Sequence, residues 1–301
     1  MKSTIGANNQ PQFFPYFLDV AEMIENNVAG KSQLNYTTRI FYKEGVGKEA
    51  IFNSVSSFVH KNKTHILLAD RMNHCIRMVD RITRRTSSIA GQCMFRGQLT
   101  MPTDLTYLDE LIYVTLYADA KIVQVDLHGD IKTIATLERR QNPYGIIINS
   151  VTKKLFITIR RGLASIQLND SQNQTNEIVE LKSMGLSTHL KGLSWIDQQT
   201  VAVADSGSGS VHLLNLATDT LTSVCHKADD PTAGKPAQII NGDREECTLY
   251  EPVAALRIGC KLYIGERNGM RVIDLTDQGQ ARQCTGKFLA WLPTITFSMG
   301  K

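Results

Sequence analysis

Several familiar signatures are missing from this chain of 301 residues. No apolar run approaches the roughly twenty residues of a membrane-spanning helix, so no membrane insertion is predicted. The N-terminal region lacks the basic start, apolar middle and small-residue cleavage site of a signal peptide. No Cys-x-x-Cys pair occurs, which argues against a structural zinc site. The formal net charge is only +4, so a polyanion-binding surface would require local clustering of basic residues.

A repeat is the strongest positive signal. Five segments each hold a short apolar strand that ends at a polar or turn position, then a polar turn, then a second alternating strand. The first strands end at positions 70, 116, 159, 205 and 266, which are 46, 43, 46 and 61 residues apart. Periods of this size are typical of propeller blades and similar arrays. The segments are Ile66–Asp80, Ile112–Asp126, Leu155–Asn169, Val201–Asn215 and Leu262–Asp274.

Each segment is flanked by two further strand signals. The upstream signals centre on Phe58, Leu105, Ile146, Leu193 and Leu256. The downstream signals lie in Thr86–Ala90, Ile131–Leu137, Glu177–Leu181, Leu221–Cys225 and Ala281–Cys284. Four strands per unit make one blade of a β-propeller. The predicted fold is therefore all-β, a β-propeller of four-stranded blades.

The stretch Leu68–Gly91, LADRMNHCIRMVDRITRRTSSIAG, resembles an NHL repeat. That pattern runs from an Ala-Asp-x-x-Asn turn through an Ile-Arg-x-Val-Asp strand to a closing Ile/Leu-Ala-Gly. The stretch Arg39–Ser54 resembles the end of such a repeat and the link into the next blade. The resemblance covers roughly residues 36–284, and it is weakest in the second and third units, where Leu116 and Ile159 replace the turn aspartate.

The resemblance implies six blades, of which five are visible as complete units. A composite sixth blade would take its inner strands from Phe288–Phe297 and its outer strand from Tyr36–Tyr42, closing the ring and removing exposed strand edges. A five-bladed ring and a fragment of a larger propeller stay open as alternatives. Residues 1–35 are then an N-terminal extension, and residues 36–301 are the NHL-like propeller.

Cysteines and glycosylation triplets bear on the compartment. In chain order the six cysteines form pairs separated by 18, 22 and 24 residues, which suits local disulfides. The pairs are Cys75 with Cys93, Cys225 with Cys247, and Cys260 with Cys284. Asn-x-Ser/Thr triplets begin at Asn35, Asn62, Asn169 and Asn173. These signals predict an extracellular or secretory-pathway glycoprotein, and a cytoplasmic protein with six reduced thiols is the alternative.

Catalytic signatures are scarce, and no cofactor is predicted. No Gly-x-Ser-x-Gly motif lies at a strand-to-helix turn. The Ser206–Ser210 run is flanked by strands, which indicates a hairpin rather than a phosphate-binding loop. The seven histidines occupy non-equivalent positions of the repeat, which argues against a shared metal site. Asp70 and Asp205 are expected to accept hydrogen bonds from the backbone amides of the turns that follow them.

Basic residues gather in one class of loop. In a propeller, the turns between second and third strands share a face with the links between blades. A guanidinium matches planar anions and stacks on aromatic rings, so this face is predicted to bind a protein or anionic partner through exposed, unpaired groups. The candidate residues are Arg71, His74, Arg139, Arg140, Arg160, Arg161 and Arg267. An acidic rim is expected from the loop that carries Asp229, Asp230, Asp243, Glu245 and Glu246.

The leading hypothesis is a non-catalytic recognition scaffold. An intracellular NHL module that binds RNA is the first alternative, since the resemblance and the arginines also suit it. A propeller enzyme of the lyase or lactonase type is the second. The basic residues Arg84, Arg85, Lys153 and Lys154 fall on the opposite face, so an ordinary solvated surface is the competing explanation for the arginine face.

Overall fold

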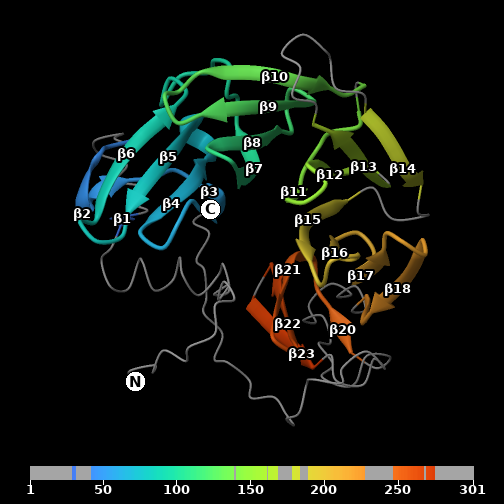
Figure 1. Ribbon diagram of the computed structural model, residues 1–301. Coiled ribbons are helices and arrows are strands. Elements are labelled where there is room, and N and C mark those ends of the chain that lie inside the picture. Colours follow the sequence, from blue (N-terminus) through green and yellow to red (C-terminus); the bar gives the residue numbers. More distant parts are fainter. Residues whose placement is uncertain are drawn as a thin grey trace, which may run out of the picture.

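The computed structural model describes residues 29–31, 42–138, 140–160, 162–168, 178–183, 189–227, 247–267 and 269–274. Their strands form five blade-like sheets that follow one another around a common centre (Figure 1). The innermost strands of successive blades contact each other. This arrangement confirms the predicted all-β propeller. The predicted sixth blade, Phe288–Phe297 with Tyr36–Tyr42, lies outside the described residues apart from Tyr42.

The first two blades have the expected four antiparallel strands. Blade one holds β3 (Val55–His60), β4 (His65–Asp70), β5 (Cys75–Asp80) and β6 (Arg85–Ala90), with the short 3-10 helix η1 (Arg71–Asn73) between β4 and β5. Blade two holds β7 (Pro102–Leu108), β8 (Leu111–Leu116), β9 (Lys121–Asp126) and β10 (Ile131–Thr136).

The remaining blades continue the same order. Blade three holds β11 (Ile146–Asn149), β12 (Lys154–Ile159), β13 (Gly162–Gln167) and β14 (Ile178–Ser183). Blade four holds β15 (Leu190–Trp195), β16 (Thr200–Asp205), β17 (Ser210–Asn215) and β18 (Thr220–Val224). Blade five shows β21 (Pro252–Ile258), β22 (Lys261–Glu266) and β23 (Gly269–Asp274), and its predicted fourth strand, Ala281–Cys284, lies outside the described residues.

Two edge strands were not expected. The segment Arg39–Ser54, predicted to be the end of a repeat and the link into the next blade, contains β2 (Gly45–Ile51), which pairs with the outer edge of blade one at β6. The short strand β1 (Ala29–Lys31) then pairs with β2 in parallel. Blade one is thereby extended to six strands in the order β1-β2-β6-β5-β4-β3. The Gly-rich segment forms an additional edge strand instead of a free connection.

The core lies between neighbouring blades. The second strands β4, β8, β12 and β16 each have five consecutive buried residues, because a strand packed on both faces needs a continuous apolar run. One cluster joins blades one and two through Leu67, Ile76 and Val114, and corresponding clusters fill the next interfaces. Burial between the blades thus holds the five described blades together in order.

Close approach of the inner strands explains two glycines. A Cβ on Gly145 would lie 2.6 Å from the carbonyl oxygen of Lys191, and one on Gly192 would lie 2.9 Å from that of Val253. Threonine hydroxyls bridge the boundary between blades two and three and the boundary between blades three and four. The Thr115 hydroxyl donates to the Tyr144 carbonyl (2.6 Å), and the Thr158 hydroxyl donates to that of Lys191 (2.8 Å). These bonds fix blade three against both of its neighbours.

Two predicted disulfides are confirmed. Cys75 and Cys93 are bonded with a Cα–Cα distance of 5.2 Å, and Cys225 and Cys247 with 4.7 Å. The second bond closes a long loop beside the short strands β19 (His226–Lys227) and β20 (Thr248–Leu249), which pair in parallel. Cys260 is also disulfide-bonded. Its expected partner, Cys284, lies outside the described residues, so that pairing stays a prediction.

Candidate recognition face

The strand order places the predicted loops at one end of the propeller. In each blade the second strand ends, and the third begins, at the end where the links from blade to blade also run. We call this end the turn face. Arg71 follows β4, Arg140 lies between β10 and β11, Arg160 follows β12 and Arg267 follows β22, so all four lie there. Arg139 and Arg161 lie outside the described residues.

A pocket of about 220 Å³ opens at the turn face where blades two, three and four meet. We call it the mouth pocket. Tyr117 enters from the β8–β9 turn, Arg160 from the β12–β13 turn and Lys191 from the start of β15. The lining is completed by Asn142, Ile159, His189 and Leu190. Arg160 and His189 are exposed, whereas Lys191 is half-buried. The pocket therefore combines basic and amide groups with an aromatic ring.

The aromatic rings of the mouth pocket organise its lysine. The Lys191 Nζ atom lies 4.3 Å from the centroid of the Tyr144 ring, which is a cation–π geometry. The rings of Tyr144 and Tyr117 meet edge to face, with centroids 6.2 Å apart. Asn142 donates from Nδ2 to the Tyr117 carbonyl (3.1 Å) and so ties the β8–β9 turn to the next link. The lysine is held in place by packing.

Electrostatics at the mouth pocket favours an anion. Burial lowers the pKa of Lys191, the Arg71 charge lowers it further, and Glu251 offsets part of the shift. Burial likewise raises the pKa of Tyr144, against an opposing effect of Arg71. Arg71 therefore lies close enough to act on both groups, and its buried Nε atom has no hydrogen-bond partner among the described residues. A bound anion would stabilise this concentration of positive charge.

Two candidates from the sequence have other local roles. His74 is buried, with 9% of its surface exposed, and its Nδ1 atom accepts the Met101 backbone N–H at 3.0 Å. Burial, and then the Arg96 charge, lower the pKa of His74. Arg267 was expected to be unpaired, and this is wrong, because it forms an ion pair with Glu251 at 3.1 Å. Arg140 and Arg160 are exposed.

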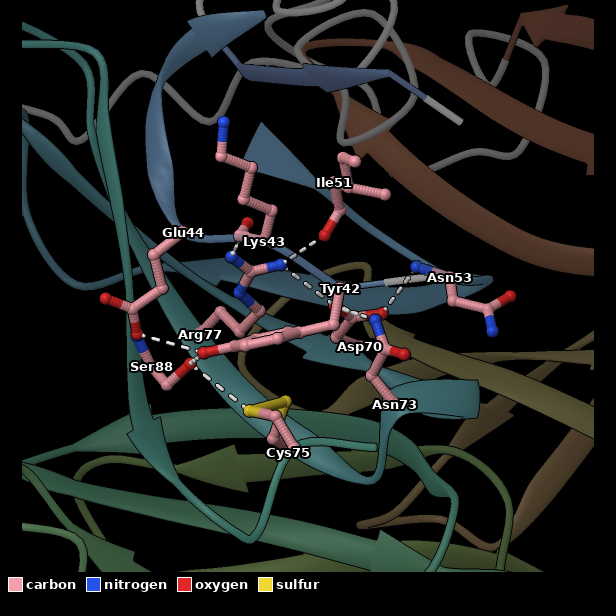
Figure 2. The surroundings of a disulfide bond; sticks show 11 residues. Tyr42, Lys43, Glu44, Ile51, Asn53, Asp70, Asn73, Cys75, Arg77 and Ser88 are labelled. Carbon is pink, nitrogen blue, oxygen red and sulfur yellow. Dashed lines mark hydrogen bonds and ion pairs between the residues drawn. A yellow bond between two sulfur atoms is a disulfide. The ribbon is translucent and has the colours of Figure 1, made fainter. Parts of the chain in front are cut away.

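The NHL-like residues of blade one form a buried network instead of a binding site (Figure 2). The Asp70 carboxylate accepts from the Asn53 backbone N–H (2.8 Å), the Asn73 side chain (2.9 Å) and Arg77 (3.1 Å). Asp70 was expected to accept from backbone amides of the following turn, and this is wrong, because that turn donates through the Asn73 side chain and the backbone donor is Asn53. The same expectation is confirmed for Asp205, which accepts from two amide groups of the Ser206–Ser210 turn. Burial raises the pKa of Asp70, against the opposing hydrogen bonds.

Arg77 completes this network and is fully buried. It donates to the carbonyl oxygens of Ile51 and Lys43, both at 2.7 Å, and its guanidinium lies against the ring of Tyr42 (Figure 2). The ring of Phe52 contacts the guanidinium as well. The register position of Arg77 is occupied by His212 in blade four and by Arg271 in blade five, where they pair with Asp205 and Glu266. The acid–base pair is thus a repeated structural element of blades one, four and five.

Asp104 is a second carboxylate with a perturbed pKa. It lies on the inner strand β7 and accepts from Ser57 of β3 (2.5 Å) and from the Ile146 N–H of β11 (2.9 Å). Burial raises its pKa to about 6, against the opposing effect of these bonds. Three blades therefore meet at one side chain. Among the described residues, no group of three or more His, Cys, Asp or Glu side chains could hold a metal ion.

Of the four glycosylation candidates, Asn62 is the one that lies among the described residues. Asn62 is exposed in the β3–β4 turn, where its Oδ1 atom accepts the Thr64 and His65 backbone N–H groups. Asn35, Asn169 and Asn173 lie outside the described residues, as does the acidic rim expected within residues 228–246. None of the described helices has the length and hydropathy of a bilayer-spanning segment. Glycosylation of all four sites stays a prediction.

Comparison with known proteins identifies the class. No protein-family model and no curated protein sequence matches the chain. A chain of a nidogen/laminin complex is similar in structure, with 15% identity, a TM-score of 0.57 and coverage of 76% of this chain and 79% of that one. A protein of unknown function from Bacteroides thetaiotaomicron VPI-5482 has 14% identity and a TM-score of 0.62, covering 83% of this chain and 61% of that one. At such identities these likenesses show the fold alone, and the chain is a β-propeller.

Proposed function

We propose that this β-propeller is a non-catalytic recognition scaffold of the NHL-like kind that binds an anionic protein partner or ligand at its turn face. One observation carries the proposal: Lys191 is held over the Tyr144 ring, beside Arg160 and within reach of the Arg71 charge. Burial and then the Arg71 charge lower the pKa of Lys191, so a carboxylate in the mouth pocket would stabilise the protonated amine and would be bound favourably.

Two further facts support this proposal. The two disulfides suit an oxidising compartment, which favours an extracellular scaffold over an intracellular RNA-binding module. The similar nidogen/laminin structure is a complex between proteins, and protein binding is therefore the function that we infer here. Among the described residues, no arrangement of a nucleophile, a base and oxyanion-stabilising donors indicates an enzyme.

The test is a matched pair of double variants. Arg160→Ala with Lys191→Ala removes two charges from the mouth pocket, and Lys63→Ala with Arg85→Ala removes two exposed charges from the opposite end. The probe is fluorescein-labelled heptaglutamate, followed by fluorescence anisotropy at several salt concentrations. We expect the first double variant to bind at least about tenfold more weakly, with a flatter salt dependence, because two charge-assisted contacts are lost.

The control variant should bind heptaglutamate as the wild type does. Thermal unfolding of both variants checks that the fold is retained. Equal losses in the two double variants would show that the peptide responds only to overall charge, and the mouth pocket would then have no special role. Binding of an octauridylate RNA in preference to heptaglutamate would instead favour the nucleic-acid alternative.

A further inference from the structure

Three large apolar side chains are exposed at the turn face of blade one. Met72 lies in η1, and Met94 and Phe95 lie in the link from β6 to β7. Their exposed fractions are 45%, 47% and 67%. We call these three residues the apolar ledge. Both segments that carry them belong to the turn face of blade one, since η1 follows a second strand and the link joins two blades.

The backbone of the ledge is held firmly in place. The Met94 N–H donates to the carbonyl oxygen of Asn73 (2.8 Å), which is the residue after Met72 and is fully buried. The preceding residue, Cys93, is bonded to Cys75 at the start of β5. The Met72 N–H donates to the Asn53 carbonyl oxygen (3.0 Å). Exposure of the three side chains is therefore built into the fold, and does not come from a loose loop.

The local backbone also carries strain. Met94 has a φ of 77°, a conformation that non-glycine residues rarely adopt. Such a conformation persists only where surrounding bonds impose it, and it is often found at functional sites. Here the disulfide and the Asn73 hydrogen bond impose it. The strained residue itself forms part of the exposed ledge.

Positive charge flanks the ledge on both sides. Arg71 directly precedes Met72, and Arg96 directly follows Phe95. The ledge and the mouth pocket share the turn face, and the charge of Arg71, the residue before Met72, also acts on Lys191 and Tyr144. The exposed apolar residues Ile82 and Val151 also have basic neighbours, but each lies in a turn at the opposite end of the propeller, away from the mouth pocket. An apolar patch bordered by cations is complementary to an acidic segment that carries a large apolar side chain.

We propose that the ledge and the mouth pocket together bind a segment of a partner protein in which a large apolar residue adjoins several carboxylates. This inference rests on the proposed function and specifies the partner's chemistry. The carboxylates would meet Arg71, Arg160 and Lys191, while the apolar side chain would cover Phe95 and the two methionines. Covering these side chains removes apolar surface from water and adds affinity that does not depend on salt.

The test compares two kinds of peptide. One is heptaglutamate, and the other is a set of seven acidic peptides in which phenylalanine replaces each glutamate in turn. We expect at least one phenylalanine peptide to bind the wild type about tenfold more tightly than heptaglutamate, as burial of part of an aromatic ring would provide. In Phe95→Ala this gain should fall below about twofold, while heptaglutamate binding is unchanged.

Two controls keep the result specific. Ile82→Ala removes an exposed apolar residue from the opposite end. It should bind the phenylalanine peptide more tightly than heptaglutamate by the same factor as the wild type. Phe95→Leu keeps an apolar side chain and should retain most of this gain. If no phenylalanine peptide binds more tightly, or if Phe95→Ala keeps the gain, the inference is wrong, although heptaglutamate binding that depends on Arg160 and Lys191 would leave the proposed function intact. If the wild type binds neither kind of peptide, both proposals fail.

Discussion

Replacing Arg77 with methionine would test the buried network of blade one. The guanidinium is fully buried, donates to two carbonyl oxygens at 2.7 Å and pairs with Asp70 at 3.1 Å. Arg77→Met keeps much of the side-chain volume but leaves the Asp70 carboxylate buried without a cation. Breaking one side of a buried ion pair costs about 3–5 kcal/mol, and we expect a loss of this size in the free energy of unfolding.

The assay is urea unfolding followed by tryptophan fluorescence, with the linear-extrapolation slope compared between variants. Burial already raises the pKa of Asp70, and loss of the guanidinium should raise it further. A carboxyl group with a raised pKa binds more protons in the folded state than in the unfolded state, so its folded form loses stability as the pH rises. The deficit of Arg77→Met should therefore be largest at neutral pH and shrink as the pH falls through the folded pKa.

A double-mutant cycle separates the pair from its surroundings. Asp70→Asn combined with Arg77→Met should lose less stability than the two single variants added together, with a coupling of about 1–3 kcal/mol. A cost below about 1 kcal/mol for Arg77→Met, or a coupling near zero, would refute the view that this network holds β2 against blade one.

Three further outcomes are expected. Asp104→Asn should remove a pH-dependent contribution to stability: since burial raises the pKa of Asp104 to about 6, wild-type unfolding free energy relative to this variant should fall as the pH rises from about 4 to 6. Gly145→Ala should lower the unfolding free energy by about 1–3 kcal/mol, because its Cβ would meet the Lys191 carbonyl oxygen at 2.6 Å. Replacing Cys75 and Cys93 with serine should cost about 3 kcal/mol by the chain-entropy model and abolish the affinity gain of the phenylalanine peptides; calorimetry and peptide binding measure the two effects.

Much of the fold could be predicted because each blade repeats one local pattern. Strands such as Ile66–Asp70 and Val201–Asp205 are apolar runs bounded by turn residues, and hairpin pairing depends only on neighbours in sequence. The disulfides Cys75–Cys93 and Cys225–Cys247 followed from chain order for the same reason. The periodicity therefore contained the information that defines a blade.

The strand β2 could not be predicted in this way. Its sequence, GVGKEAI, lacks an alternating apolar pattern. It is held at the edge of blade one by pairing with β6 and by the hydrogen bonds that Arg77 donates to Lys43 and Ile51. These contacts join positions more than twenty residues apart, which a local pattern does not encode.

The candidate site, like the fold, could be predicted from the sequence only in part. Arg71 and Arg160 could be placed at the turn face from the repeat register alone. Lys191 and Tyr144 were not predicted, because they are brought together by the packing of blade three against blade four. The hydrogen bond from Thr158 to the Lys191 carbonyl oxygen stabilises this packing. The mouth pocket lies between blades, so its lining follows from packing and not from any one repeat.

Zero-length cross-linking would test the recognition face most directly. A carbodiimide joins a glutamate carboxylate of bound heptaglutamate to a nearby lysine amine, and mass spectrometry locates the bond. Because the pKa of Lys191 is lowered, more of this amine is neutral and nucleophilic than at an ordinary exposed lysine. We expect cross-links to concentrate on Lys191 and to disappear with excess unlabelled peptide. Cross-links spread equally over Lys63 and Lys153, at the opposite end of the propeller, would contradict the proposed recognition face.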